Sequence, residues 1–385
     1  MNTHTRGRVI HTGQAMVDLV LQIAALPELG GDTFARTWEL TAGGGFNVMA
    51  AAARDGAHVV YAGTHGTGPF GDTVRAAMAA EGIEVTTSAV PYEDTGISVA
   101  LVDDSAERTF VSTSGAETRA RVQDFRATRP GPRDVVYVTG YSLVHPENRT
   151  ALLEWIPDLD PATQMVVDPS PMIEEFAMED VRALAGRATV WSTNAREARL
   201  LLARLGVGAA EMDAAEVGAV ETDAAVVGAA GTGDLPDLSD AELAALLVRG
   251  LGCAVVLRAG SRGATIAHRS ERGNAGENRD TEGPAGPGTT QRSTDADGAL
   301  PQTLVGGIDV QSVPAPSVKA IDTNGAGDAH CGVLCATLAA GGDLAEAVRR
   351  ANVAAAMSVT RRGPATAPAR AQIDAAMRDG LPAQP

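Results

Sequence analysis

Short apolar runs alternate with longer helical stretches over most of this chain, and this alternation constrains its fold more than any other feature. The apolar runs predict β-strands at residues 8–13, 58–63, 134–140, 164–170, 188–194 and 253–260. Several are continuously apolar and bounded by Gly, Asp or Asn, as expected for parallel strands buried on both faces. The helical stretches between them lie at residues 46–56, 71–82, 146–156, 195–206 and 239–250. The sequence therefore predicts an α/β fold with a mostly parallel central sheet flanked by helices.

Two regions break this alternation, at about residues 14–41 and 96–114. Their apolar and polar residues alternate with period 2, as in ISVALVD and RTFVST, and no helix separates the segments. Such patterning is typical of antiparallel strands exposed on one face. We therefore expect a small β-sheet that projects from the main body. The alternative is an antiparallel edge on the main sheet.

Two further stretches have the composition of surface insertions within a single domain spanning residues 1–385. Residues 206–234 are rich in Ala, Gly, Val and acidic residues, and residues 270–302 contain almost no large apolar residue. Neither can bury enough apolar surface to offset its ordering entropy, so both are expected to be mobile. The first could instead extend a helix, since Ala and Glu favour helices.

Charge and composition exclude several classes of function. The formal net charge is −17 and basic residues form no long cluster, which argues against nucleic acid or an anionic membrane as partner. The polar N-terminus does not resemble a signal peptide, and no apolar run approaches the roughly 18 residues of a membrane span. With only three cysteines, a cytoplasmic location is expected. Lys319 is the only lysine and lies outside any glycine loop, which excludes P-loop NTPases and protein kinases.

The strongest motif is Ile321-Asp322-Thr323-Asn324-Gly325-Ala326-Gly327-Asp328, which precedes an apolar helical run. Small residues at a helix start let an anion approach the free backbone N–H groups, and the helix dipole favours negative charge there. Asp328 could accept a proton from a hydroxyl while these N–H groups hold the departing phosphoryl charge. The alternative is a plain turn in which an Asp caps the helix.

A second motif, Gly43-Gly44-Gly45-Phe46-Asn47, leads into a helix, and Asp18 follows the end of the first strand. Glycines allow close approach of a ligand to the backbone, and Asn offers both a donor and an acceptor. In open α/β sheets this end of the strands faces the ligand. Asp18 and Asn47 could therefore bind a polyol, or the motif could be a glycine loop with an Asn cap.

Two weaker motifs follow. Asn194 and Glu197 share one face of a helix start, where they could order water and Mg²⁺ around nucleotide phosphates, or could simply cap the helix. Arg258, Gly260 and Gly263 lie in a predicted strand–turn–strand that could shape a nucleotide pocket, or could form an ordinary tight turn.

These motifs, in this order and spacing, resemble the ribokinase-like carbohydrate kinases of the PfkB family from about residue 8 to residue 378. The resemblance implies a ribokinase-like three-layer fold with a small β-sheet lid. It implies the following roles: Asp328 as catalytic base with Gly325, Ala326 and Gly327 as the anion hole; Asp18, Gly43, Gly44 and Asn47 as sugar-binding residues; Asn194, Glu197, Arg258, Gly260, Gly263 and Asn352 as nucleotide-binding residues.

The resemblance also implies ATP and Mg²⁺ as cofactors, with Glu197 near the magnesium ion. A loop that often holds a monovalent cation such as K⁺ is implied as well, with the following donors or neighbours: Asp322, Asn324, Ser358, Arg361 and Gly363. Gly140-Tyr141-Ser142 stands where ribokinases place a sugar-binding Glu, which argues against ribose itself.

The expected function is therefore transfer of the γ-phosphoryl group of ATP to a primary hydroxyl of a small sugar or nucleoside. The alternatives are a kinase of the same fold for a keto-deoxy acid or a pseudouridine-type substrate, and a non-catalytic sugar- or nucleotide-binding regulator. A homodimer formed through the lid is also expected.

Overall fold

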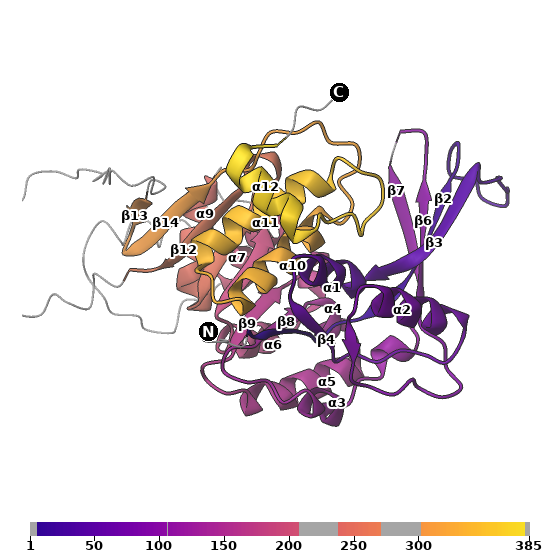
Figure 1. Ribbon diagram of the computed structural model, residues 1–385, viewed down its shortest axis with the longest axis horizontal. Helices are drawn as coiled ribbons and strands as arrows, with labels where there is room; N and C mark the ends of the chain where they lie inside the picture. Colours follow the sequence, from indigo (N-terminus) through magenta and orange to yellow (C-terminus); the bar gives the residue numbers. More distant parts are fainter. Residues whose placement is uncertain (1–5, 106, 208–237, 271–301, 382–385) are drawn as a thin grey trace, which may run out of the picture. The chain divides into compact units, whose positions relative to one another are not determined.

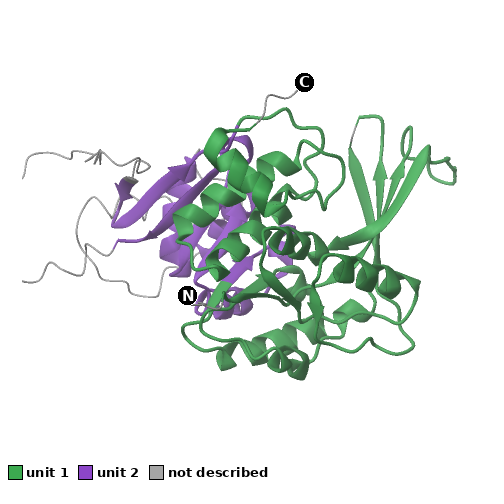
Figure 2. Cartoon of the chain, in the orientation of Figure 1, with its two compact units in different colours: residues 1–165, 317–385 green, residues 166–316 purple. Residues whose placement is uncertain are grey.

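The computed structural model describes residues 6–105, 107–207, 238–270 and 302–381. The chain divides into two compact units, one made of residues 1–165 and 317–385 and the other of residues 166–316 (Figure 2). The predicted insertions at 206–234 and 270–302 fall almost entirely outside the described residues. Among the described helices, none is both long and apolar enough to span a membrane.

The first unit contains a parallel sheet (Figure 1). Its strands, in spatial order, are β8 (Val135–Thr139), β1 (Arg8–His11), β4 (His58–Tyr61) and β5 (Glu84–Val85). Every residue of β8 is buried, which agrees with its continuous run of apolar residues. Strands β1, β4 and β8 begin within one residue of the predicted start and end one or two residues before the predicted end, whereas β5 was not predicted.

Helices of the first unit come from both ends of the chain. They are α1 (Gly45–Arg54), α2 (Pro69–Ala80), α3 (Val122–Ala127), α4 (Tyr141–Val144), α5 (Pro146–Trp155), α10 (Ala326–Ala339), α11 (Leu344–Ser358) and α12 (Arg370–Asp379). Helices α1 and α10 pack closely: a Cβ added at Gly332 of α10 would lie 2.4 Å from the carbonyl oxygen of Val48 in α1. Small residues at this contact therefore bring together the helices that carry Asn47 and Asp328.

A separate four-stranded sheet projects at the right of Figure 1 and confirms the predicted small sheet. Its strands, in spatial order, are β3 (Thr37–Gly44), β2 (Ala15–Gln22), β6 (Ile97–Val102) and β7 (Arg108–Ser112). The pairs β2–β3 and β6–β7 are antiparallel as predicted, but β2 and β6 pair in parallel. The reason is that α1, β4 and α2 connect the two hairpins, and a long crossover of this kind allows parallel pairing.

The register of this sheet separates two chemically different faces. Asp18 pairs with Thr41 and Ser98, and Ser98 pairs with Ser112, so these side chains share one face, called here the Asp18 face. On the opposite face Leu19 pairs with Leu40 and Val99. This apolar face consists of Leu19, Leu21, Trp38, Leu40, Val99, Leu101 and Val111.

The second unit contains a mixed sheet. Its strands, in spatial order, are β13 (Gln302–Val305), β14 (Ile308–Val313), β12 (Ala264–Arg269), β11 (Ala254–Arg258), β10 (Val190–Asn194) and β9 (Gln164–Asp168). Strands β9, β10 and β11 are parallel, whereas β12 and β14 run antiparallel to their neighbours. Its helices are α6 (Met178–Ala185), α7 (Ala195–Leu205) and α9 (Asp240–Leu251).

Candidate active site

Helix α10 begins at a turn that only glycine can make. Gly325 has φ +73°, and a Cβ there would lie 2.0 Å from the carbonyl oxygen of Pro364. Gly327, one residue into the helix, has no atom within 4 Å of the place where a Cβ would stand. The first turn of α10 is therefore accessible to a ligand. Its N–H groups and the helix dipole give this end of α10 the character of an anion-binding site.

Asp328 lies in this first turn, and Asn47 of α1 holds its side chain. The Nδ2 of Asn47 donates a hydrogen bond of 3.1 Å to Oδ2 of Asp328, although 281 positions separate the two residues. Asn47 is buried, and its Oδ1 has no hydrogen-bond partner within the part of the chain that the structure describes. The two glycine-rich motifs of the sequence thus meet at one carboxylate, with an unused amide acceptor beside it.

Asp18 on β2 is a second carboxylate of this site. Burial, together with the negative charge of Asp328, raises the pKa of Asp18 to about 6. On β3, a Cβ at Gly43 would stand 2.0 Å from Oδ2 of Asp18, so Asp18 occupies the space that a side chain at position 43 would need. Gly44, with φ +59°, then turns the chain into α1. The predicted sugar-binding residues Asp18, Gly43, Gly44 and Asn47 are therefore close together in one unit.

Gln14 belongs to the same region, although its sequence position gave no reason to single it out. Its backbone carbonyl accepts a hydrogen bond from the N–H of Gly45, at the start of α1. Its side-chain Nε2 lies 3.3 Å from Oγ of Ser142, and its buried Oε1 has no partner among the described residues. A neutral amide and a hydroxyl therefore lie beside each other next to the start of α1.

Asp322 begins the loop before α10, and its carboxylate accepts several hydrogen bonds. Its Oδ1 accepts from the N–H of Asn324 at 2.9 Å, and its Oδ2 accepts from the N–H of Gly363 at 3.1 Å. Arg108 of β7 adds an ion pair, with 2.6 Å between its NH2 nitrogen and Oδ1 of Asp322. Partial burial acts to raise the pKa of Asp322, but the amide hydrogen bonds and the charge of Arg108 outweigh it, so this pKa is lowered.

The other residues predicted near a monovalent cation surround this loop. The carbonyl oxygen of Ser358 accepts hydrogen bonds from the N–H of Arg361 at 3.1 Å and from Oγ1 of Thr366 at 3.0 Å. The carbonyl of Gly363 accepts from Thr366 at 3.3 Å. The structure thus brings Asp322, Asn324 and Gly363 together, with the Asp322 carboxylate bonded to the N–H groups of the other two residues.

In the second unit, Asn194 and Glu197 cap helix α7 reciprocally. The N–H of Glu197 donates to Oδ1 of Asn194 at 3.0 Å, and the N–H of Asn194 donates to Oε2 of Glu197 at 2.9 Å. The Nδ2 of Asn194 also donates to Oε1 of Glu197 at 2.6 Å. The capping alternative raised from the sequence is therefore present. It fixes both side chains at the start of α7, where a helix dipole favours phosphate.

Arg258, at the end of β11, connects two carboxylates of this unit. Its NH1 nitrogen donates to Oδ2 of Asp168 at 2.7 Å, and its NH2 nitrogen lies 3.6 Å from Oε2 of Glu197. Gly260 and Gly263 turn the chain back into β12, as the sequence predicted, both with positive φ. Gly263 also passes close to the backbone of β14, since a Cβ there would lie 2.1 Å from the carbonyl oxygen of Val313. Asn352, on α11 of the other unit, is buried.

The donors of the second unit suit magnesium held through water better than magnesium held directly. Within the described residues, no group of three or more His, Cys, Asp and Glu side chains could hold a metal ion. Mg²⁺ keeps most of its waters and prefers oxygen donors such as the carboxylate of Glu197 and the amide oxygen of Asn194. These residues fit water ligands of a nucleotide-bound magnesium ion.

Two residues of the first unit are not apparent as site residues from the sequence. Gln14 and Arg108 approach the site because of strand pairing and loop geometry. The only available signal was period-2 spacing, which places Arg108 on the Asp18 face once the register of β2, β6 and β7 is known: Arg108 pairs with Val102, and Val102 with Gln22. Spacing within one strand cannot supply that register.

Comparison with known proteins identifies the family of this chain. The model of the pfkB family carbohydrate kinases matches residues 7–233 and 292–371. An uncharacterized sugar kinase of Escherichia coli, YegV, is 27% identical over 370 residues, which cover 96% of this chain and 94% of that protein.

Solved structures show the same fold. Ribokinase from Giardia lamblia aligns with a TM-score of 0.68 and 20% identity over 97% of this chain and 99% of that one. Aminoimidazole riboside kinase from Salmonella enterica, complexed with aminoimidazole riboside and an ATP analogue, aligns with a TM-score of 0.61 and 20% identity over 95% and 99%. The chain therefore belongs to the pfkB family of carbohydrate kinases and is an ATP-dependent carbohydrate kinase.

Proposed function

We propose that this kinase transfers the γ-phosphoryl group of ATP to a primary hydroxyl of a small, neutral sugar or nucleoside. The observation that carries this proposal is Asp328, a carboxylate in the first turn of α10 that is held by Asn47. A base in this position can take the hydroxyl proton while the adjacent N–H groups of α10 stabilise the charge that develops on the phosphoryl oxygens. Gly325, Ala326 and Gly327 supply those N–H groups.

The side chains around Asp328 favour a neutral substrate. Asp18 is a second carboxylate near it, and two negative charges oppose the approach of an anionic substrate group. Neutral acceptors and donors of the same region lie on Asn47, Gln14 and Ser142. Hydroxyl groups can donate to the carboxylate and to the amide oxygens, whereas a keto-deoxy acid would bring a third carboxylate close to Asp18 and Asp328. A sugar or nucleoside therefore fits better than a keto-deoxy acid.

The nucleotide is assigned to the second unit by residue chemistry. Asn194 and Glu197 at the start of α7 would order the waters of a magnesium ion, and Arg258, Gly260 and Gly263 would form one side of the nucleotide pocket. For Asn352, on α11 of the first unit, we keep the adenine-side role that the family resemblance implies. When bound, Mg²⁺ neutralises charge on the transferring phosphates. This proposal takes over the roles that the family resemblance implied.

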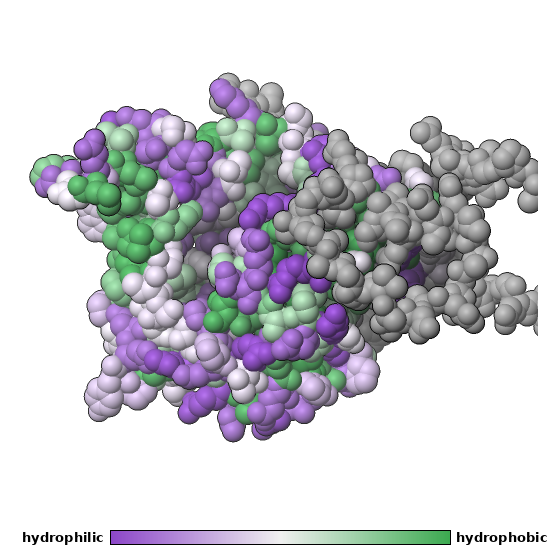
Figure 3. Space-filling view, turned by 180° about the vertical axis from the view of Figure 1, so that it is seen from behind, coloured by the Kyte–Doolittle hydropathy of each residue, from purple (hydrophilic) through white to green (hydrophobic). Residues whose placement is uncertain are grey.

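A further part of the proposal is a homodimer formed through the apolar face of the four-stranded sheet. Trp38 and Val111 of this face are 70% and 61% exposed. Figure 3 shows apolar side chains gathered over this sheet at the left of the view. Exposed apolar patches of this kind mark interaction surfaces, and a second copy of the sheet offers a matching one.

A substrate screen with ADP detection tests the activity. Wild-type protein is assayed with ATP against neutral pentoses, hexoses, nucleosides and keto-deoxy acids, beside Asp328→Asn and the control Asp72→Asn. Asp72 also lies in the first turn of a helix, α2, but its exposed side chain pairs with Arg75. On the best substrate, Asp328→Asn should lower kcat by about 10²- to 10⁴-fold and leave ATP binding unchanged, because Asn cannot accept the proton.

Three results would contradict the proposal. An Asp328→Asn enzyme that keeps a tenth of wild-type kcat would remove the base assignment. A best substrate among the keto-deoxy acids would overturn the preference for a neutral substrate. Absence of ADP production above the Asp328→Asn background with every compound would favour the non-catalytic binding protein instead.

A further inference from the structure

The ion pair between Arg108 and Asp322 joins the four-stranded sheet to the loop before α10. The Asp322 side chain is 15% exposed and that of Arg108 is 29% exposed, so the pair is largely shielded from water. Two backbone N–H groups, from Asn324 and Gly363, also donate to the same carboxylate. A guanidinium and two amides together neutralise and satisfy this carboxylate.

This arrangement does not fit a monovalent cation at Asp322. Such a cation needs oxygen lone pairs that are not already used, and a backbone carbonyl has two. Both acceptor positions of the Ser358 carbonyl are taken, by the N–H of Arg361 and the hydroxyl of Thr366. The neighbouring Val359 carbonyl likewise accepts from Ile321 at 2.7 Å and from Asp322 at 3.1 Å. The negative charge that would attract the cation already has a partner in Arg108.

Arg108 reaches this loop from the Asp18 face of the sheet. It pairs across the strands with Val102, which pairs with Gln22, and Gln22 lies four residues beyond Asp18 on β2. One face of the sheet therefore presents both the carboxylate near Asp328 and the cation on Asp322. Asp322 begins the loop that ends at Gly325, where α10 starts. Because Arg108 holds Asp322, it influences the geometry of the anion hole at the start of α10.

We propose that Arg108 supplies, from the four-stranded sheet, the positive charge at Asp322 that a monovalent cation supplies in the family pattern, so that this kinase works without K⁺. Arg108 is a positioning residue: it acts through Asp322 on the N–H groups at Gly325–Gly327. Arginine suits this task because it stays charged at all working pH values and offers a rigid donor fork. The effect on turnover rests on the proposed kinase function, whereas the effect on the loop does not.

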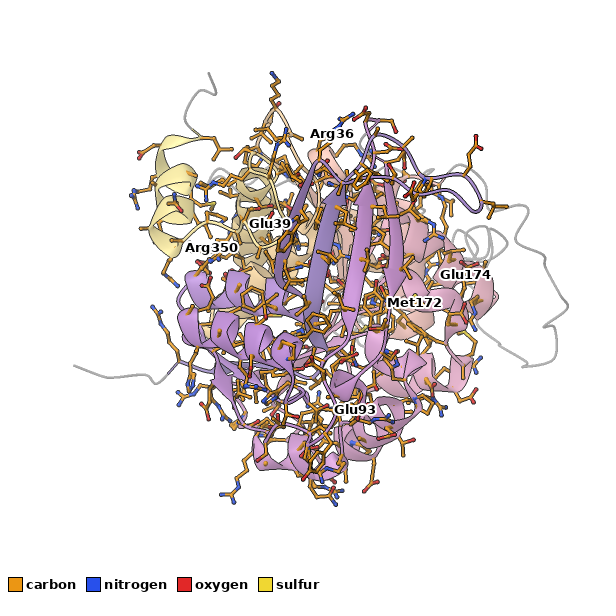
Figure 4. The ribbon with its side chains drawn as sticks, turned by 90° about the vertical axis from the view of Figure 1, so that its right-hand side faces the viewer. Arg36, Glu39, Glu93, Met172, Glu174 and Arg350 are labelled. Atoms are coloured by element: carbon orange, nitrogen blue, oxygen red, sulfur yellow. The ribbon has the colours of Figure 1, made fainter. Side chains whose placement is uncertain are left out.

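The test compares K⁺ with choline at equal ionic strength for wild type, Arg108→Met, Arg108→Lys and a control, Arg36→Met. Arg36 is also an arginine beside this sheet, labelled at its upper end in Figure 4, but it pairs with Asp104 and is 59% exposed. Two quantities are measured: the melting temperature of the protein without substrate, and kcat on the best substrate. The melting arm needs no activity and therefore remains informative if the substrate class is wrong.

For wild type and for Arg36→Met, each protein should have the same melting temperature in K⁺ as in choline. The kcat of each should also agree between the two salts within about twofold. Arg108→Met should lose at least about tenfold of kcat in choline and recover most of it in K⁺, with a higher melting temperature in K⁺. Arg108→Lys, which keeps the charge, should remain indifferent to K⁺ with a smaller loss.

Wild type activated more than about fivefold by K⁺ would overturn the proposal, because the cation would then still be needed. An Arg108→Met protein whose loss K⁺ does not repair would also overturn it, since the role of Arg108 would not be that of a cation at Asp322. If Arg108→Met fails to fold, the response of wild type and Arg108→Lys to K⁺ still decides the question.

Discussion

The carboxylates of Asp18 and Asp328 lie close enough to influence each other near the N-terminal end of α10. The pKa of Asp18 is raised from its ordinary value of 3.8 to about 6 because the side chain is buried and because Asp328 is negative. Its charged form is therefore less stable in the folded protein than in the unfolded chain. The proposed function gives this unfavourable charge a purpose, because substrate hydroxyls would donate to it.

Asp18→Asn should therefore stabilise the fold while weakening sugar binding. Stability from the protonated carboxyl is fully present below about pH 4 and is lost as the pH rises through about 6. Asn imitates the protonated form, so its advantage over wild type should grow as the pH rises from about 4 to about 6 and level off above pH 6 at no more than about 3 kcal/mol. Melting curves at pH 4 and pH 8 measure this difference, with Asp72→Asn as the exposed control.

Kinetics provide the second half of this prediction. The KM for the sugar should rise by about 10- to 100-fold in Asp18→Asn, because a hydrogen bond to a charged acceptor is lost, while the KM for ATP stays nearly constant. For wild type, the sugar KM should rise as the pH falls below about 6. Equal changes in both KM values would show that Asp18 does not contact the sugar.

At the scale of single elements, the close contact between α1 and α10 positions Asn47 against Asp328. Gly332→Ala places a Cβ 2.4 Å from the Val48 carbonyl oxygen, and backbone on both sides leaves little room to adjust. We expect a loss of about 1–3 kcal/mol of stability, seen in denaturant unfolding, together with lower kcat. The matched change Gly250→Ala in α9 meets side-chain atoms, Cδ1 of Leu205 at 3.0 Å and Cγ2 of Val207 at 3.4 Å, and should be neutral or slightly stabilising. Equal losses of stability in both variants would show that the close α1–α10 contact is not the cause of the loss in Gly332→Ala.

A buried arginine connects three elements at the other end of α1. Arg350 of α11 contacts Asp55, which follows α1, and Asp374 of α12, each at 2.6 Å. Asp55 is fully buried. Arg350→Met should cost about 3–5 kcal/mol because it leaves the charge of Asp55 uncompensated, and the double variant with Asp55→Asn should recover much of that loss. Unfolding in urea measures both, and a double variant no more stable than Arg350→Met would contradict this view.

The sequence allowed most elements to be placed but not the contacts between them. Apolar runs and glycine stops located β1, β4 and β8 to within a few residues, because strands buried on both faces carry a strong local signal. The motifs around Asn47 and Asp328 were visible because each is a short local pattern in the sequence. The contact of Arg108 with Asp322 depends on strand register and loop closure over long separations, which no local pattern encodes. The parallel pairing of β2 with β6 was missed for the same reason.

At the scale of the whole molecule, the formal charge of −17 opposes association of two copies, while the apolar face of the four-stranded sheet favours it. We expect the chain to elute as a dimer, and the dimer to tighten as salt rises from about 0.03 to 0.3 M because salt screens the repulsion. Light scattering after size exclusion measures the mass.

Substitutions on the two faces of this sheet distinguish loss of the dimer surface from general damage to the sheet. Trp38→Glu, on the apolar face, should give a monomer. Phe110→Glu, on the Asp18 face and 56% exposed, should leave the dimer intact. A dimer that persists in Trp38→Glu and disappears in Phe110→Glu would move the interface to the Asp18 face.

The close fit of Gly43 against Asp18 also limits the order in which this protein could change by mutation. Because the carboxylate of Asp18 fills the place of a Cβ at position 43, any side chain there is tolerated only in a chain that has already replaced Asp18 with a smaller residue. Conversely, once position 43 carries a side chain, Asp18 cannot return without a second change. A drift toward a different substrate would therefore pass first through the loss of Asp18, and a library randomised at position 43 alone would recover almost only glycine.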